Sequence, residues 1–205
     1  MTRRHHPALA ALLLTLATNG CATAMSTSTD SKIERPAQTD AVPLKFKRHN
    51  FAAHCYNAVG CRVFYNNHDF SPYVGEDDLD SRVSNAPVDA NYREYWGFAN
   101  YLGVRNFPEP VQVRWKSLDG VAHEAQVDIG EIFRDELILH RVPAADMAHF
   151  FDGPVAGEPG IFLEVNDRTL SVFMKMLIPT KTLQRPGHEH SNYRADLILA
   201  WSRTY

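Results

Sequence analysis

The chain has 205 residues, 44% of them hydrophobic and 22% charged, and its formal net charge at pH 7 is −3. An acidic balance argues against nucleic acid as a partner, because nucleic-acid-binding domains carry clustered Lys and Arg. The length is sufficient for one domain with its own hydrophobic core, and the sequence shows no internal repeat.

A basic start and a short apolar run are the first features along the chain. Arg3 and Arg4 precede the run, which covers residues 8–17 and ends at the polar and small residues 18–20. A helix that crosses a bilayer needs about 20 apolar residues. The shorter run therefore predicts an export signal over residues 1–20, which is removed from the mature protein.

Cys21 directly follows a glycine at the end of this signal, as the lipidated cysteine does in bacterial lipoproteins, which this segment resembles. The resemblance implies a lipid on Cys21, and Ala22, in place of the Asp that retains lipoproteins in the inner membrane, implies the periplasmic face of the outer membrane. Thr18 departs from the aliphatic residue usual at its position, so a secretory signal cleaved near Ala24 is the alternative. Residues 21–43 are rich in Ser, Thr, Ala, Asp and Pro, which predicts a flexible tether.

Two further cysteines, Cys55 and Cys61, form an even pair once Cys21 is assigned to the lipid. Exported proteins face an oxidising compartment, so we predict a structural disulfide between them. Their spacing matches neither a Cys-x-x-Cys redox pair nor a zinc knuckle. A metal site, or a thiolate activated by the nearby His49, His54 or His68, is the alternative.

Apolar and polar residues alternate with period two from residue 44 onward, which predicts half-buried strands. Residues 111–129 alternate on both sides of Asp119-Gly120, and residues 161–178 alternate on both sides of Asn166-Asp167. Such dipeptides tolerate the positive φ of tight turns, so each segment predicts a β-hairpin. Further strands are predicted over residues 44–51, 62–65 and 197–201.

Helical signals are few. Pro143 suits the first turn of a helix that Gly153-Pro154 would follow, and a second helix is predicted over residues 91–101. We therefore predict that residues 44–205 form a single mainly β domain, an antiparallel β-sandwich or open barrel with one or two short helices.

Residues 71–110 form the longest stretch without a regular pattern. Long loops of this kind are usually functional or disordered, and the aromatic residues within this one argue against disorder. Tyr and Trp anchor protein interfaces, and acidic side chains steer a basic partner. The predicted partner-binding residues are Asp77, Asp78, Asp80, Tyr92, Tyr95 and Trp96. The alternatives are that Tyr95 and Trp96 cover the sheet, and that the acidic run is a solvated surface.

Signatures of known chemistry are missing from the sequence, which has no Gly-x-Ser-x-Gly, His-Glu-x-x-His, phosphate-binding glycine loop or dinucleotide fingerprint. His188-Glu189-His190 offers two metal ligands at most, and the preceding Pro186-Gly187 favours a solvated turn. We accordingly predict no catalytic residues, no metal and no cofactor.

Five segments of the sequence carry a resemblance to a known family: residues 47–51, 55–65, 127–133, 164–169 and 199–205. They resemble a family of small proteobacterial lipoproteins that is associated with immunity to type VI secretion lipase effectors, and they cover less than half of the mature chain. Membership would imply a periplasmic protein that binds and blocks a phospholipase toxin, with no catalytic residues of its own.

Two other functions stay open at this point. One is a structural lipoprotein of an envelope assembly. The other is an envelope hydrolase that uses His140, His188 or His190 on an unfamiliar fold. The neighbouring genes discriminate between them, because a lipase effector next door favours immunity and an assembly operon favours the structural role.

Overall fold

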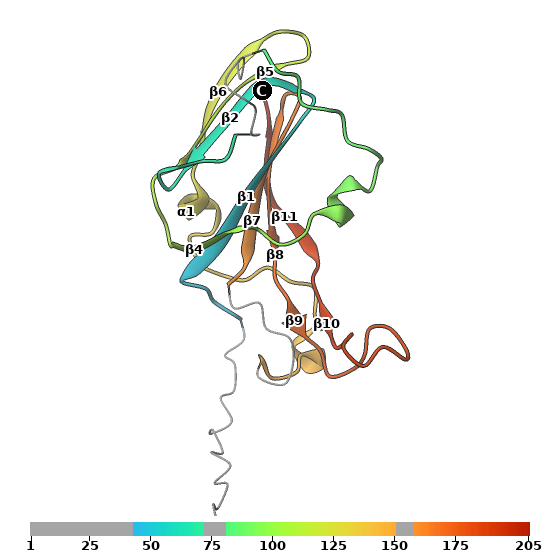
Figure 1. Ribbon diagram of the computed structural model, residues 1–205. Coiled ribbons are helices and arrows are strands. Elements are labelled where there is room, and N and C mark those ends of the chain that lie inside the picture. Colours follow the sequence, from blue (N-terminus) through green and yellow to red (C-terminus); the bar gives the residue numbers. More distant parts are fainter. Residues whose placement is uncertain (1–42, 72–80, 151–157) are drawn as a thin grey trace, which may run out of the picture. The chain divides into compact units, whose positions relative to one another are not determined.

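A computed structural model of the chain describes residues 43–71, 81–150 and 158–205 (Figure 1). The predicted export signal, Cys21 and the tether lie outside these residues. All of the described residues belong to one compact unit. None of the helices within them is long and apolar enough to cross a membrane.

Two open β-sheets form most of this unit, which confirms the prediction of a mainly β sandwich (Figure 1). The five-stranded sheet contains, in spatial order, β11 (Leu197–Thr204), β8 (Thr169–Lys175), β7 (Gly160–Asn166), β1 (Arg48–Tyr56) and β4 (Tyr101–Arg105). The four-stranded sheet contains β3 (His68–Asp69), β2 (Ala58–Tyr65), β5 (Val111–Ser117) and β6 (Ala122–Val127). A small separate sheet pairs β9 (Ile178–Pro179) with β10 (Tyr193–Arg194).

Strand pairing within the two large sheets is antiparallel except between β1 and β7, which run parallel in register from Asn50↔Gly160 to Tyr56↔Asn166. The parallel pair follows from the chain order, because β1 enters the sheet first and the hairpin of β7 and β8 joins it from far along the sequence. A parallel pair needs a long connection, and here that connection carries the whole four-stranded sheet.

The main hydrophobic core lies between the inner faces of the sheets. Val111, Val113 and Trp115 of β5 are at most 2% exposed, whereas the residues between them are exposed, as their alternation predicts. Ile161 and Leu163 of β7 belong to the same buried cluster. Burial of side chains of this size stabilises the fold by about 1.5–3 kcal/mol each.

Both predicted hairpins are confirmed, and the turn of the second lies one residue later than predicted. Gly120, with φ of +84°, lies in the β5–β6 turn, where glycine avoids the steric cost of a left-handed backbone. In the β7–β8 hairpin Asn166 pairs with Thr169, so the two loop residues are Asp167 and Arg168. Asp167 has φ of +50°, which an Asp side chain tolerates.

The predicted helices are corrected to single turns. In place of a helix over residues 91–101, the 3₁₀ turn η1 (Tyr92–Tyr95) is followed by extended chain and then by β4. In place of a helix after Pro143, the 3₁₀ turn η2 (Ala144–Asp146) ends where Met147 bridges to Thr180. Pairing of Met147 with Thr180 competes with helix continuation at the second site, whereas packing of Tyr92 and Trp96 on the five-stranded sheet replaces it at the first.

One short α-helix escaped the sequence analysis. Helix α1 (Ile129–Ile132) begins where residue 129 was expected to continue the second strand of the first hairpin. Asp128 caps it, because its side chain accepts a hydrogen bond from the backbone N–H of Glu131 at 2.9 Å. Ile129 turns into the core beneath it.

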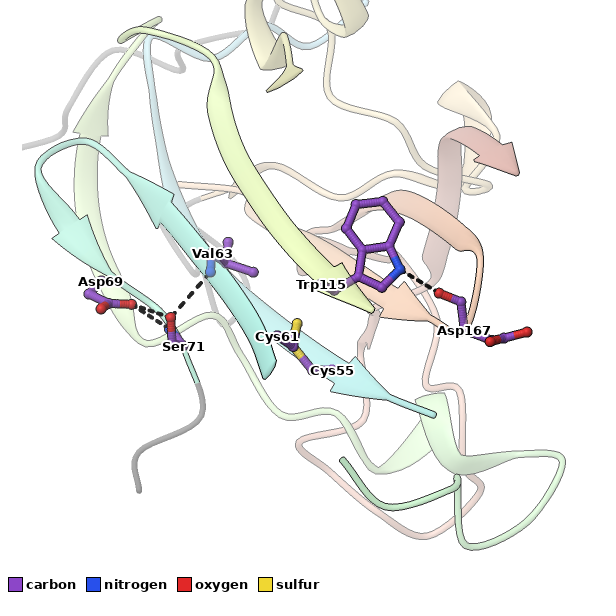
Figure 2. The surroundings of a disulfide bond; sticks show 7 residues. All are labelled: Cys55, Cys61, Val63, Asp69, Ser71, Trp115 and Asp167. Carbon is purple, nitrogen blue, oxygen red and sulfur yellow. Dashed lines mark hydrogen bonds between the residues drawn. A yellow bond between two sulfur atoms is a disulfide. The ribbon is translucent and has the colours of Figure 1, made fainter. Parts of the chain in front are cut away.

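The disulfide between Cys55 and Cys61 is present, as predicted (Figure 2). It joins the end of β1 in one sheet to β2 in the other, across a turn in which Asn57 has φ of +49°. On the same side of the core, the indole N–H of Trp115 donates to the backbone oxygen of Asp167 at 2.6 Å. The disulfide and this hydrogen bond thus connect the two sheets at the end where the chain passes from β1 to β2.

Candidate partner-binding surface

The predicted partner-binding residues fall into three groups in the structure. Asp77, Asp78 and Asp80 lie outside the described residues. Tyr92 and Trp96 are 8% and 5% exposed, whereas Tyr95 is 71% exposed. Tyr95 is therefore the one member of the predicted set that a partner can reach in the described part of the chain.

Trp96 packs on the outer face of the five-stranded sheet. Its ring stacks on His54 of β1 at a centroid distance of 4.3 Å and lies 5.7 Å from the ring of Phe162 on β7. Its indole N–H donates to the hydroxyl of Tyr56 at 3.0 Å. The prediction that Trp96 is a free interface anchor is corrected here, because its burial matches the alternative in which it covers the sheet.

Tyr92 is corrected for the same reason, and its hydroxyl takes part in a buried polar cluster. Glu164 of β7 is 1% exposed, and it accepts hydrogen bonds from the hydroxyl of Tyr92 and from Arg93, whose Nη2 lies 2.6 Å from Oε2. Burial and the Glu164 carboxylate raise the pKa of Tyr92 to about 12. Because a buried carboxylate requires such donors, this cluster fastens the η1 segment to the sheet.

Above this buried layer the same segment exposes apolar side chains. Large apolar residues are usually buried, and scattered exposed ones need no explanation, but several along one short segment favour an interaction surface. More than half of each of these side chains is accessible to solvent: Val83, Val88, Tyr95, Phe98 and Leu102.

A hollow of about 530 Å³ opens beside Phe98. Its walls come from β1, β3, the stretch 97–101 and Phe162 of β7. On one wall His68 stacks on Tyr101 at 4.7 Å, and Phe70 meets the same ring edge-on at 5.2 Å. The hollow therefore combines aromatic walls with polar groups, which is the composition of a binding site.

The edge of β1 faces this hollow. Pairing between β1 and β4 ends at Phe51↔Tyr101, whereas pairing between β1 and β7 continues to Tyr56. Over residues 52–56, β1 thus has no second strand partner among the described strands. An unpaired strand edge is a template for an extended segment of another chain.

His54 lines the hollow from this edge. Burial lowers its pKa to about 4, so its imidazole is neutral at pH 7. Its Nε2 is buried and makes no hydrogen bond to the described residues. A neutral ring stacked on Trp96 contributes apolar surface to the hollow, and the disulfide leaves no free thiol nearby for the Cys/His chemistry considered above.

Comparisons with protein-family models, with curated proteins and with solved structures found no match. The candidate surface therefore stands on its geometry.

One Ser–His pair lies elsewhere, in the β5–β6 hairpin. Ser117 Oγ lies 2.9 Å from His123 Nε2. The Asp119 carboxylate and the backbone oxygen of Val121 also lie within hydrogen-bond distance of this hydroxyl, so three acceptors compete for its one proton. Ser117 is fully buried, so this pair lacks the access that a nucleophile needs.

The three histidines of the hydrolase alternative differ in their exposure to solvent. His188 and His190 are exposed on a turn, whereas His140 is half-buried. Within residues 43–71, 81–150 and 158–205, no group of three or more His, Cys, Asp or Glu side chains is placed to hold a metal ion.

Proposed function

We propose that this chain is a lipid-anchored periplasmic binding protein that inhibits a phospholipase effector of type VI secretion. The observation that carries the proposal is the exposure of Tyr95 and Phe98 on the segment that covers the sheet, with Phe98 lining an aromatic hollow beside an open strand edge. Such a surface suits the capture of a protein segment better than the turnover of a small substrate.

The buried layer supports this role by making the surface rigid. Trp96, Tyr92 and Arg93 hold the segment to β7 and β1, so little conformational entropy is lost when a partner binds to the side chains above them. Tyr95, Phe98 and Leu102 then act as preformed anchors.

The nature of the partner and the location come from the sequence. The resemblance described above points to a lipase effector, and Cys21 after an export signal points to the outer membrane. The disulfide is consistent with an oxidising compartment. A structural role in an envelope assembly would need the same location but would not require inhibition of an enzyme.

The test is to measure the affinity of the mature protein for candidate lipase effectors together with the residual phospholipase activity. We expect stoichiometric inhibition, and we expect Tyr95→Ser combined with Phe98→Ser to weaken binding by at least about thirtyfold, as for central interface anchors. The matched control is Leu183→Ser, an exposed apolar residue outside the surface. Binding without inhibition, or equal affinity in both variants, would contradict the proposal.

A further inference from the structure

The tip of the β5–β6 hairpin exposes two apolar side chains. Leu118 and Val121 flank the turn and are 59% and 51% exposed. Their backbone is held in place, because the N–H of Leu118 donates to Asp167 at 2.8 Å and the N–H of Val121 donates to Asp119 at 3.2 Å. The side chains therefore project from a rigid turn, which lies at the top of Figure 1.

Cationic side chains lie directly behind this tip. Arg114 and Lys116 point outward from β5, and Arg62 of β2 stands opposite Arg114 in the strand register. Each of the two arginines also has an acidic neighbour, because Glu124 is paired with Arg114 in the strand register and Asp69 interacts electrostatically with Arg62. Glu124 is the acidic side chain on the same wall, so cations outnumber it.

The three cations line a hollow of about 630 Å³ on the outer face of the four-stranded sheet. A β-bulge between Val59 and Arg62 shapes it, and Gly60, with φ of +59°, adds no side chain there. The whole chain has a net charge of −3, so this positive site opposes the overall charge. The lining of the hollow holds three cationic side chains and one carboxylate, and such a local excess of positive charge favours an anionic ligand.

We propose that the hairpin tip and this hollow dock onto a membrane surface that contains anionic phospholipid. Leu118 and Val121 enter the boundary between head groups and acyl chains, while Arg114, Lys116 and Arg62 bind lipid phosphates. Apolar side chains beside a group of cations are the combination that binds peripheral proteins to anionic bilayers. This contact uses a different hollow from the one beside Phe98, and it would orient the tethered domain.

Vesicle flotation of the mature chain with Cys21→Ala, which removes the proposed lipid anchor, tests the docking. Vesicles contain either phosphatidylcholine alone or equal parts of phosphatidylcholine and phosphatidylglycerol. We expect at least about tenfold stronger binding to the anionic vesicles, and weaker binding as salt is raised. Arg114→Gln with Lys116→Gln should lower that binding about tenfold or more.

The matched control is Arg134→Gln with Arg185→Gln, which removes the same charge from exposed positions elsewhere and should change binding less than about twofold. Leu118→Ser with Val121→Ser should weaken binding severalfold while leaving the melting temperature unchanged. This variant tests the docking if the Arg114→Gln, Lys116→Gln protein fails to fold. Three results would overturn the proposal: equal binding to both vesicles, equal loss in the control, or no loss in the tip variant. Suppression by millimolar inorganic phosphate, beyond that by sodium chloride of equal ionic strength, would also overturn it, because it would assign the hollow to free phosphate.

Discussion

The outer faces of the two sheets differ, because β7 is buried on both faces whereas β5 alternates buried and exposed residues. On the five-stranded sheet, Phe162 and Phe173 lie under a cover formed by Tyr92 and Trp96. On the four-stranded sheet, the outward residues of β5 are polar and bare to solvent. The covered face of the five-stranded sheet forms a second small hydrophobic core. The uncovered face of the four-stranded sheet presents charged side chains to solvent.

The difference shows that an irregular segment, the stretch around η1, forms part of the hydrophobic core. Residues of η1 and the stretch after it have no regular pattern, yet two of their aromatic side chains, Tyr92 and Trp96, are as buried as those of the strands. A buried face without a second sheet must be covered by something, and β7, which is buried on both sides, requires that cover.

Removal of the cover should have the largest effect. Trp96→Ala deletes a buried indole, so we expect the free energy of unfolding to fall by about 3–5 kcal/mol. Tyr95→Ala, on the exposed side of the same segment, should change it by less than about 0.5 kcal/mol. Denaturant unfolding of both variants tests this contrast, and equal stability of the two would contradict the assignment of Trp96 to the core.

A carboxylate exchange on each face sharpens the comparison. Glu164→Gln removes the buried charge that Arg93 and Tyr92 bind, so we expect a loss of about 2–3 kcal/mol. Glu124→Gln on the bare face should be close to neutral. If thermal unfolding shows the same small change for both, the polar cluster does not hold the cover.

The disulfide should contribute less than the cover. In the chain-entropy account, a bond that closes so short a loop stabilises the fold by about 2 kcal/mol, and Cys55→Ser with Cys61→Ser should lose about that amount. Peptide mapping of periplasmic protein without reductant should recover the two cysteines joined. Two free thiols in that material would contradict the bond.

The effect that is smallest at pH 7 is a pH dependence from the cover. His54 has a pKa of about 4 in the folded protein and about 6.5 when unfolded, so the unfolded state binds its proton first as the pH falls. Stability from this group is complete well above pH 6.5 and declines as the pH falls, by about 2 kcal/mol at pH 5 and about 3 kcal/mol at pH 4. His54→Phe should flatten the curve of unfolding free energy against pH in this window, whereas His190→Phe should leave it unchanged.

The alternation of apolar and polar residues predicted the β-sandwich because it identifies strands and the hairpins between strands that are close in the sequence. The hairpin of β5 and β6 was visible in the alternation around Asp119-Gly120. The parallel pair of β1 and β7 was not visible, because its partners are more than 100 residues apart and each strand has the same composition in either direction. The same holds for the open edge of β1, which depends on where β4 stops pairing.

The candidate surface was predicted in its sequence location but not in its residues. Residues 71–110 were expected to bind a partner, and the accessible apolar side chains lie in that segment. Tyr95 and Trp96 are adjacent aromatic residues that the sequence does not distinguish. Only the packing of η1 against β7 turns Trp96 inward and leaves Tyr95 exposed. The hollow arises from four separate segments, which no local pattern reports.

Hydrogen exchange of the protein with and without its effector tests most directly where the partner binds. If the effector pairs with the open edge of β1 and covers the apolar segment, amides of residues 52–56 and 95–102 should gain protection in the complex. The β5–β6 hairpin, residues 111–127, serves as the internal reference and should not change. Protection of that hairpin, with no change at residues 52–56 and 95–102, would contradict the assignment of the binding surface.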